Sequence, residues 1–163
     1  NGSFAQSNES YSKKGVVRGL HFQWNPYMGK LVRTIKGHMI DMVLDIRKGS
    51  DTYGCLLLYN MKAEPKFNYS EWIWIPPGFA HGNFFLEETI IEYFCSGSYN
   101  PNCEASISPL SKDLHWDLVD KKLVKEFEKI KCGNLIISDK DKNGLSLNQW
   151  GNNKNYSKFV FNK

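Results

Sequence analysis

The sequence predicts an all-β protein, an antiparallel jelly-roll barrel with a minor helix near its C-terminus. Short apolar runs rich in β-forming residues recur along the chain, clusters of Gly, Pro and Asn separate them, and helical periodicity is absent until late. With 163 residues, of which 41% are hydrophobic and 14% aromatic, the chain is long enough to bury a sizeable core. Because no repeat or linker divides it, we expect one domain over residues 1–163 that ends in a tail at 151–163.

The first half of the chain is organised around residues 15–23, GVVRGLHFQ, whose apolar residues indicate a strand with a buried face. Gly37 separates two further runs in a pattern that is typical of a hairpin. Residues 3–14 are polar and alternate, which suits an edge or interface strand. The expected strands are 3–14, 15–23, 30–36, 39–46 and 53–60, with loops or turns at 24–29, 47–52 and 61–69.

The second half begins with EWIWI at 71–75, a strand that Pro76 and Pro77 end. A compact turn at 78–82, which carries His81, is expected next. The remaining expected strands are 84–86, 89–95 and 105–108, with a turn at 97–102.

One helix is expected, over residues 117–131. Leu118, Leu123, Phe127 and Ile130 recur there among charged residues, near helical spacing. No other segment shows this pattern, and residues 152–163 resemble an irregular tail.

Charge and cysteine content narrow the class of protein. A formal net charge of +4, from 21 basic and 17 acidic residues, is mild, so nucleic-acid binding is not expected. The cysteines Cys55, Cys95, Cys103 and Cys132 lack CxxC spacing, which indicates reduced thiols. No apolar run is long enough to span a bilayer and no signal-type segment opens the chain, so we expect a cytoplasmic protein that binds no membrane.

The histidines argue against a metal site. Cupin-type jelly rolls often bind metal through an HxH pair, a Glu and a distant His, whereas His21, His38, His81 and His115 form no HxH pair. We expect a metal-free pocket in the barrel mouth instead. His38 and His115 are interpreted as structural or exposed. His21 lies in an apolar strand, where a titratable side chain needs a partner or a function.

Several motifs occur together in one order. They are GVVRGLHFQ at 15–23, GKLVR at 29–33, Asp41 with DIR at 45–47, WIPPGFAHG at 74–82, Tyr93 and Cys95 followed by YNP at 99–101, and SDKD at 138–141. Together they resemble the dTDP-4-dehydrorhamnose 3,5-epimerase family over about residues 4–147, nearly the whole chain. The first and fourth motifs are the most specific.

The resemblance implies a homodimeric, cofactor-independent epimerase of the isomerase class. It would invert C3 and C5 of a nucleotide-linked 4-keto-6-deoxy sugar, in deoxysugar and surface-polysaccharide biosynthesis. Carried over by motif, His21 is the general base, Asp141 its carboxylate partner, Lys30 the group facing the keto oxygen and Tyr93 the proton donor. The implied substrate-binding residues are Gln6, Arg18, Gln23, and the pair of His81 with Asp41.

General chemistry independently supports these residue types. A C–H bond beside a ketone is acidified because its carbanion delocalises onto the carbonyl oxygen. Epimerisation therefore needs a base, a group that stabilises the oxyanion, and an acid on the opposite face, but no redox cofactor. Taken alone, Arg18 could be a structural ion-pair partner and Asp141 a turn or helix-cap residue.

The proton donor depends on the alignment register. Counting forward from His81 places Phe94 in its position, whereas counting backward from the YNP motif places Tyr93 there; we prefer Tyr93, with a one-residue deletion at Glu87–Glu88. If Phe94 faces the pocket instead, inversion at C3 alone, or a related keto-sugar isomerase acting on a dTDP- or GDP-sugar, becomes the better interpretation. A non-catalytic jelly-roll module that binds sugar nucleotides is the alternative from another class.

The chain departs from the family in two places. Family members usually have a few dozen residues before the segment at 4–10, and we expect those preceding residues to be missing or not included here. Residues 117–133 replace a short family connection and have no assigned role.

Overall fold

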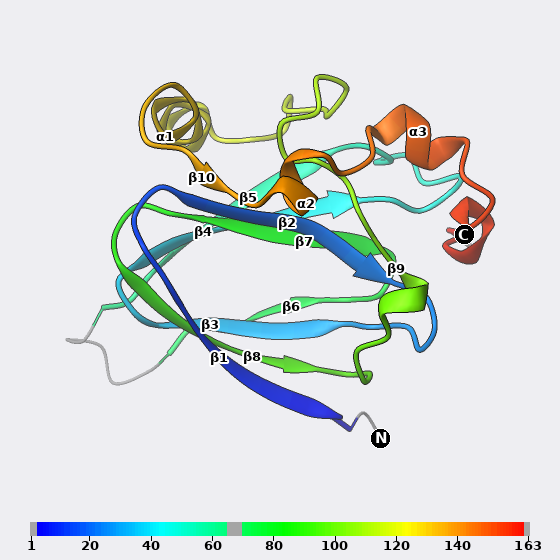
Figure 1. The fold of residues 1–163 in the computed structure, drawn as a ribbon, viewed down its shortest axis with the longest axis horizontal. Helices are drawn as coiled ribbons and strands as arrows, with labels where there is room; N and C mark the ends of the chain where they lie inside the picture. Colours follow the sequence, from blue (N-terminus) through cyan, green and yellow to red (C-terminus); the bar gives the residue numbers. More distant parts are fainter. Residues whose placement is uncertain (1–2, 65–69, 162–163) are drawn as a thin grey trace.

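Two β-sheets face each other in the computed structural model, which describes residues 3–64 and 70–161 (Figure 1). The first sheet contains, in spatial order, β1 (Gln6–Ser12), β8 (Thr89–Cys95), β3 (Lys30–Lys36) and β6 (Ile73–Ile75). The second contains β10 (Ile136–Ile137), β2 (Val16–Gln23), β7 (Phe79–Phe85), β4 (His38–Asp45) and β5 (Leu56–Lys62), and β9 (Glu104–Ser106) also pairs with β2. All pairs except β10 with β2 are antiparallel, so the predicted jelly-roll fold is confirmed.

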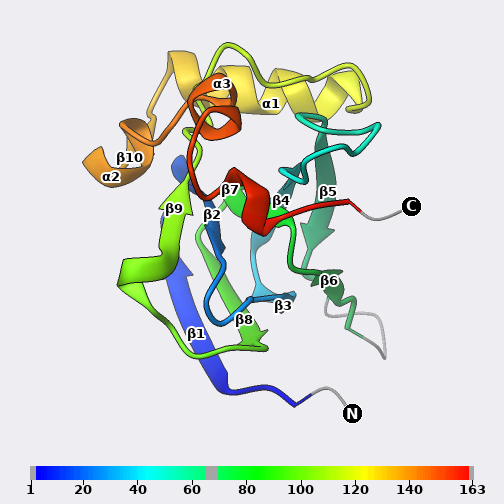
Figure 2. The ribbon, with the colours of Figure 1, turned by 90° about the vertical axis from the view of Figure 1, so that its right-hand side faces the viewer.

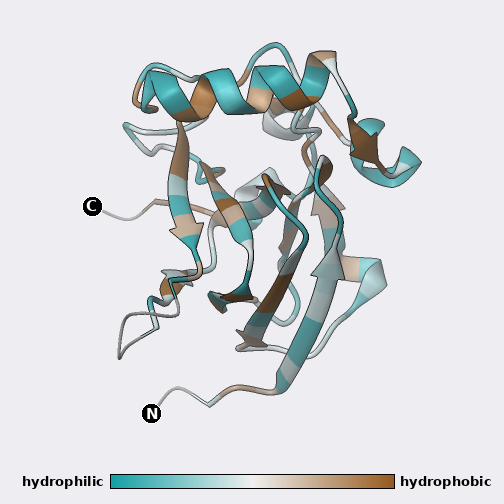
Figure 3. Ribbon diagram, turned by 90° about the vertical axis from the view of Figure 1, so that its left-hand side faces the viewer, coloured by the Kyte–Doolittle hydropathy of each residue, from teal (hydrophilic) through white to brown (hydrophobic). Residues whose placement is uncertain are grey.

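The helices lie on the outer side of the second sheet (Figures 1 and 2). They are α1 (Lys121–Cys132), α2 (Asp139–Lys142) and α3 (Leu147–Gly151), with short 3₁₀ turns at Pro101–Cys103 and Tyr156–Lys158. Helix α1 carries hydrophobic and hydrophilic residues along its length (Figure 3). Its Phe127 is buried against Phe84 of β7, with ring centroids 5.3 Å apart. The predicted helix is thus confirmed, and it covers the sheet.

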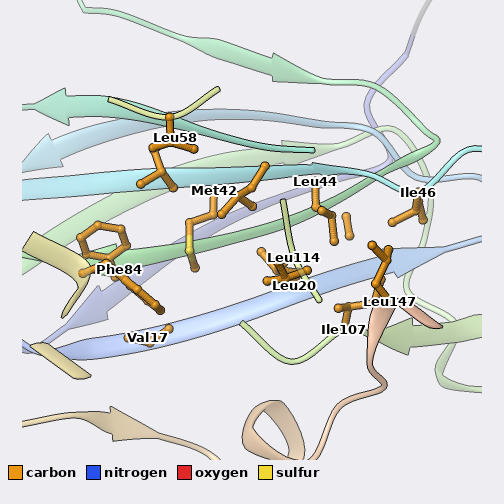
Figure 4. Close-up of a cluster of buried hydrophobic side chains, with 14 of the residues drawn as sticks. Val17, Leu20, Met42, Leu44, Ile46, Leu58, Phe84, Ile107, Leu114 and Leu147 are labelled. Atoms are coloured by element: carbon orange, nitrogen blue, oxygen red, sulfur yellow. The ribbon is translucent and has the colours of Figure 1, made fainter. Parts of the chain in front are cut away.

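Side-chain alternation divides the core into two clusters. Ile40, Met42 and Leu44 of β4 belong to the cluster that faces the helices, of which Figure 4 labels Met42 and Leu44. Met39 and Val43 face the first sheet instead. Because both faces of β4 are covered, the strand reads as a nearly continuous apolar run. The same alternation turns Asp41 toward the space between the sheets.

The predicted hairpin of residues 30–36 and 39–46 is wrong. Strand β3 pairs with β8 and β6, whereas β4 pairs with β5 and β7, so Gly37 carries the chain from one sheet to the other. Its φ of 89° is a conformation that glycine adopts without steric cost. The strand pattern was correct, but local sequence does not specify which sheet each strand joins.

The predicted turn at 78–82 is also wrong, because most of it belongs to β7. Gly82 lies within this strand, where an added Cβ atom would come 2.3 Å from the carbonyl oxygen of Arg18 on β2. The glycine therefore permits close approach of two strands and marks no turn. His81 consequently lies on a strand, where its position is fixed.

The C-terminal segment is more ordered than the predicted tail. Phe159 is buried, with its ring centroid 5.9 Å from that of Phe22 and 6.2 Å from that of Trp150. Val160 forms a β-bridge with Lys48. The short helices α2 and α3 were not predicted. Residues 65–69, part of the predicted loop at 61–69, lie outside the described residues, and residues 61–62 belong to β5.

Candidate active site

A cavity of about 250 Å³ opens between the sheets, where β2 and β8 end and β3 begins. The second sheet supplies His21 and His81 to its wall, and the first sheet supplies Lys30 and Tyr93. Titratable side chains therefore approach the cavity from two opposite walls. This is the position in which barrels commonly bind small molecules.

His21 is bonded to Asp141 despite a separation of 120 residues. Its Nε2 lies 2.7 Å from Asp141 Oδ1, and the backbone N–H of Gly19 donates to Oδ2 over 3.3 Å. The parallel pairing of β10 with β2 brings the following helix, α2, beside His21. The Ser138 hydroxyl accepts from the Asp141 N–H at the start of α2 and so fixes the carboxylate.

The charge of Asp141 is set by opposing effects. Burial raises the pKa of its carboxyl, but the hydrogen bond and the charge of His21, followed by the N–H of Gly19, outweigh burial and hold the pKa below its ordinary value. Asp141 is therefore an ionised acceptor at neutral pH, and His21 carries a hydrogen on Nε2. Its Nδ1 is the ring nitrogen left to take up a proton.

A second imidazole–carboxylate pair lies beside the first. His81 Nε2 is 2.7 Å from Asp41 Oδ1, and both residues are buried. Among the described residues, the other carboxylate oxygen of Asp41 has no hydrogen-bond partner. His81 lies in the cavity wall, so the pair predicted from the sequence is formed and faces the cavity through its imidazole.

Lys30 begins β3 and is paired in register with Cys95 on one side and Ile75 on the other. Burial lowers the pKa of its ammonium, although nearby Cys95 acts in the opposite direction. A partly desolvated ammonium in a cavity wall attracts a developing negative charge more strongly than one in water.

Tyr93 and Phe94 point to opposite faces of the first sheet. Tyr93 lines the cavity, whereas the Phe94 ring packs on the outer face, with centroids 5.4 Å from Phe4 and 5.6 Å from Trp72. Burial raises the pKa of the Tyr93 phenol, Cys95 adds to this, and Arg18 opposes it. The phenol therefore keeps its proton at neutral pH and is available as a donor.

The family model described as dTDP-4-dehydrorhamnose 3,5-epimerase matches residues 1–149 of the chain. The chain belongs to this family. A dTDP-4-dehydrorhamnose 3,5-epimerase of Methanothermobacter thermautotrophicus is 40% identical over 147 residues, which cover 90% of this chain and 72% of the relative. The enzyme of the same name from Shigella flexneri is 39% identical over 86% of this chain and 70% of the relative.

Solved structures of the epimerase family share the fold. The crystal structure of dTDP-6-deoxy-D-glucose-3,5-epimerase from Legionella pneumophila Philadelphia 1, in complex with dTDP-4-keto-L-rhamnose, matches with a TM-score of 0.76 and 32% identity. The match covers 99% of this chain and 76% of that one. The likeness therefore extends over the whole barrel and the C-terminal helices.

Arg18 has protein partners in this member of the epimerase family. One guanidinium nitrogen donates to the Ser10 hydroxyl over 2.6 Å and another to the Tyr11 carbonyl over 3.0 Å, both on β1. The described residues that line the cavity include Gln6 but not Arg18. Its side chain ties β2 to the edge of the first sheet, and the predicted contact of Arg18 with substrate stays a prediction.

Other cavity residues were not predicted as site residues of this epimerase-family chain. They are Asn8, Phe22, Met28, Ile75, Phe79, Cys95, Tyr99 and Glu104. Tyr99 donates to Glu104 over 3.0 Å, and Lys140 donates to the same carboxylate oxygen over 2.7 Å. Cys95 and Tyr99 belong to the quoted motifs, and alternation along β8 and β1 would have indicated Cys95 and Asn8.

The four cysteines are free thiols. Within residues 3–64 and 70–161, no three His, Cys, Asp or Glu side chains are grouped to hold a metal ion. None of the helices in these ranges is long and apolar enough to cross a membrane.

Proposed function

We propose that this chain inverts C3 and C5 of a dTDP-linked 4-keto-6-deoxy sugar, as a dTDP-4-dehydrorhamnose 3,5-epimerase. The observation that supports this most directly is the His21–Asp141 pair at 2.7 Å in a cavity whose opposite wall carries Lys30 and Tyr93. A base, a cation for the oxyanion and an acid on the far side are what epimerisation beside a ketone requires.

The first step is proton removal from the carbon beside the ketone. Nδ1 of His21 takes up the proton, and the electron pair of the C–H bond moves onto the carbonyl oxygen to form an enolate. Asp141 stabilises the imidazolium that results. The ammonium of Lys30 stabilises the enolate oxygen, and its partial desolvation strengthens that interaction.

The second step is protonation from the opposite wall. Tyr93 gives its phenolic proton to the carbon, the enolate collapses to the ketone, and the stereocentre is inverted. Solvent then reprotonates the phenolate and takes the proton from His21, after which the second carbon reacts in the same way. Tyr93 is the residue that favours double inversion over inversion at C3 alone, because Phe94 in its place would offer no proton.

The remaining polar residues of the wall bind the substrate. His81, oriented by Asp41, lies in register with His21 and contacts the sugar ring. Gln6 and Asn8 lie on β1 at the cavity and contact the nucleotide-linked part.

The test is solvent exchange. The chain is incubated in D₂O with a dTDP-linked 4-keto-6-deoxy sugar, and deuterium at each carbon is counted by NMR and mass spectrometry. Label at both C3 and C5 is expected, and a His21→Asn variant should give none. Label at one carbon would leave a C3-only epimerase. Binding without any label would mean that the chain is a non-catalytic module that binds sugar nucleotides. A GDP-linked sugar tested in parallel shows which nucleotide the chain prefers.

Exposed aromatic side chains on the outer face of the first sheet favour a homodimer. Phe4, Trp72 and Trp74 are each more than a third exposed, and the Phe4 ring contacts both Trp74 and Phe94, which joins them into one aromatic surface. Exposed apolar patches of this kind mark protein interfaces. The unpaired edge of β1 lies beside it, so we propose that a second copy of this chain covers this face.

A further inference from the structure

Two loops form the mouth of the cavity. Residues 24–29 follow β2 and bring Met28 to the cavity, and residues 96–100 follow β8 and bring Tyr99. We infer that Gln23, the last residue of β2, is a positioning residue that joins these loops and thereby sets the affinity for the nucleotide-linked substrate. The inference deepens the proposed function and rests on it.

The amide of Gln23 reaches both loops. Its Nε2 donates to the carbonyl of Pro26 over 2.9 Å and to that of Ser98 over 3.0 Å, while Oε1 accepts from the backbone N–H of Asn100 over 2.7 Å. Both amide hydrogens are therefore used within the protein, and the residue is only 3% exposed. Gln23 also lines the cavity, so its predicted contact with substrate stays a prediction beside the contacts that order the loops.

Three other hydrogen bonds join the same loops. The Asn100 amide donates to the Asn25 carbonyl over 2.8 Å. Gly29 and Ser96 exchange two bonds, one through the Ser96 hydroxyl at 2.8 Å and one between backbone groups at 3.0 Å. Gln23 contributes three bonds at the buried centre of this arrangement. Its loss would leave three backbone groups without their partner.

The positions of the residues that we propose for the chemical step do not depend on these loops. His21 lies on β2, Lys30 on β3 and Tyr93 on β8, where strand pairing fixes them. Loosening the mouth should therefore weaken binding and leave the chemical step nearly unchanged. If the ordered arrangement falls to about a tenth of the population, the apparent dissociation constant rises about tenfold.

The experiment compares two loosening variants with a control. Gln23→Met keeps the length of the side chain without its hydrogen bonds, and we expect its KM for the keto-sugar and its Kd for dTDP to rise about tenfold, with kcat changed less than about twofold. Asn100→Ala removes the bond to the Asn25 carbonyl and the bond that Asn100 Oδ1 accepts from the Asn102 N–H, at a partly exposed position, and its KM and Kd should rise about threefold. Amide hydrogen exchange over 24–29 and 96–100 should quicken in both.

Gln149→Leu is the matched control. Gln149 accepts from the Ser146 N–H in the capping box of α3, so its loss should lower the melting temperature without changing KM. A Gln23→Met variant that melts earlier with unchanged KM and Kd overturns the inference. If that variant does not fold, unchanged KM and Kd of Asn100→Ala overturn it. If the wild type incorporates no deuterium, the proposed function fails, and the dTDP titrations still decide the inference.

Discussion

His21 and His81 lie in register on the neighbouring strands β2 and β7, and each is bonded through Nε2 to its own carboxylate. The two pairs differ in exposure: the His21 side chain is 28% exposed and that of His81 only 8%. A general base must reach the carbon acid, and the proton it accepts must leave to solvent. The difference therefore favours His21 as the base and His81 as a fixed group of the wall.

Replacing Asp141 with Asn should lower kcat by about 10²–10⁴ while the fold is kept. The amide has nearly the shape of the carboxylate, but it carries no charge to stabilise the imidazolium and can present N–H to Nε2, which favours the wrong tautomer. Steady-state epimerisation rates measure the effect. Asp139→Asn, an exposed neighbour on α2, should keep the wild-type rate. A kcat for Asp141→Asn within twofold of wild type contradicts the role.

Replacing Tyr93 with Phe should separate proton removal from inversion. His21 would still remove a proton and return a solvent-derived one to the same face, so deuterium enters the substrate without inversion. Inversion should fall by about 10²–10⁴. NMR that reports label and configuration together measures both. Tyr59→Phe, on an exposed part of β5, is the control. If Tyr93→Phe inverts the substrate at the wild-type rate, another residue is the proton donor.

The sequence predicted most strands because alternation and glycine or proline breaks are local properties. It misassigned the partners of β3 and β4 because pairing is decided by which apolar faces meet, not by the turn between them. It placed His81 in a turn because the glycines around it resemble turn residues, although Gly82 serves close packing against β2. The burial of Phe159 depends on Phe22 and Trp150, which are distant in sequence.

The candidate site was predictable where a motif carried it. His21, Asp141, Lys30, His81 and Tyr93 came from motifs, and the structure brings them to one cavity or its immediate support. The hydrogen-bond partners of Arg18 and Gln23 were not predicted, because they are set by tertiary contacts: Arg18 bonds to β1, and Gln23 bonds to two loops.

Asp45 should make stability sensitive to acid. Burial alone raises the pKa of its carboxyl, but bonds from Arg47, Ser50 and Thr52 outweigh burial and lower the pKa from 3.8 to about 2. A folded-state pKa below the unfolded value contributes stability above pH ~4 that is lost as pH falls toward ~2, here about 2 kcal/mol.

Chemical denaturation of Asp45→Asn tests this. Near pH 7 the free energy of unfolding of the variant should be about 2 kcal/mol lower than that of the wild type. This difference should narrow as pH falls from about 5 to 3. Asp117→Asn, at an exposed carboxylate before α1, should change neither the free energy of unfolding near pH 7 nor its dependence on pH. A gap that stays constant over this range would show that the charge of Asp45 is not responsible.

Replacing Trp74 with Glu should convert the proposed dimer to monomers. Trp74 is 46% exposed and lies 6.2 Å from the Phe4 ring on the outer face of the first sheet, so a carboxylate there would have to be desolvated when a second copy covers the face. Leu57→Glu is the matched control, since Leu57 is 51% exposed but lies on β5 of the other sheet. Sedimentation velocity should show twice the chain mass of 18.8 kDa for wild type and Leu57→Glu, and a single chain for Trp74→Glu. A wild type that sediments as a monomer, or a Trp74→Glu variant that stays dimeric, would remove this face as the interface.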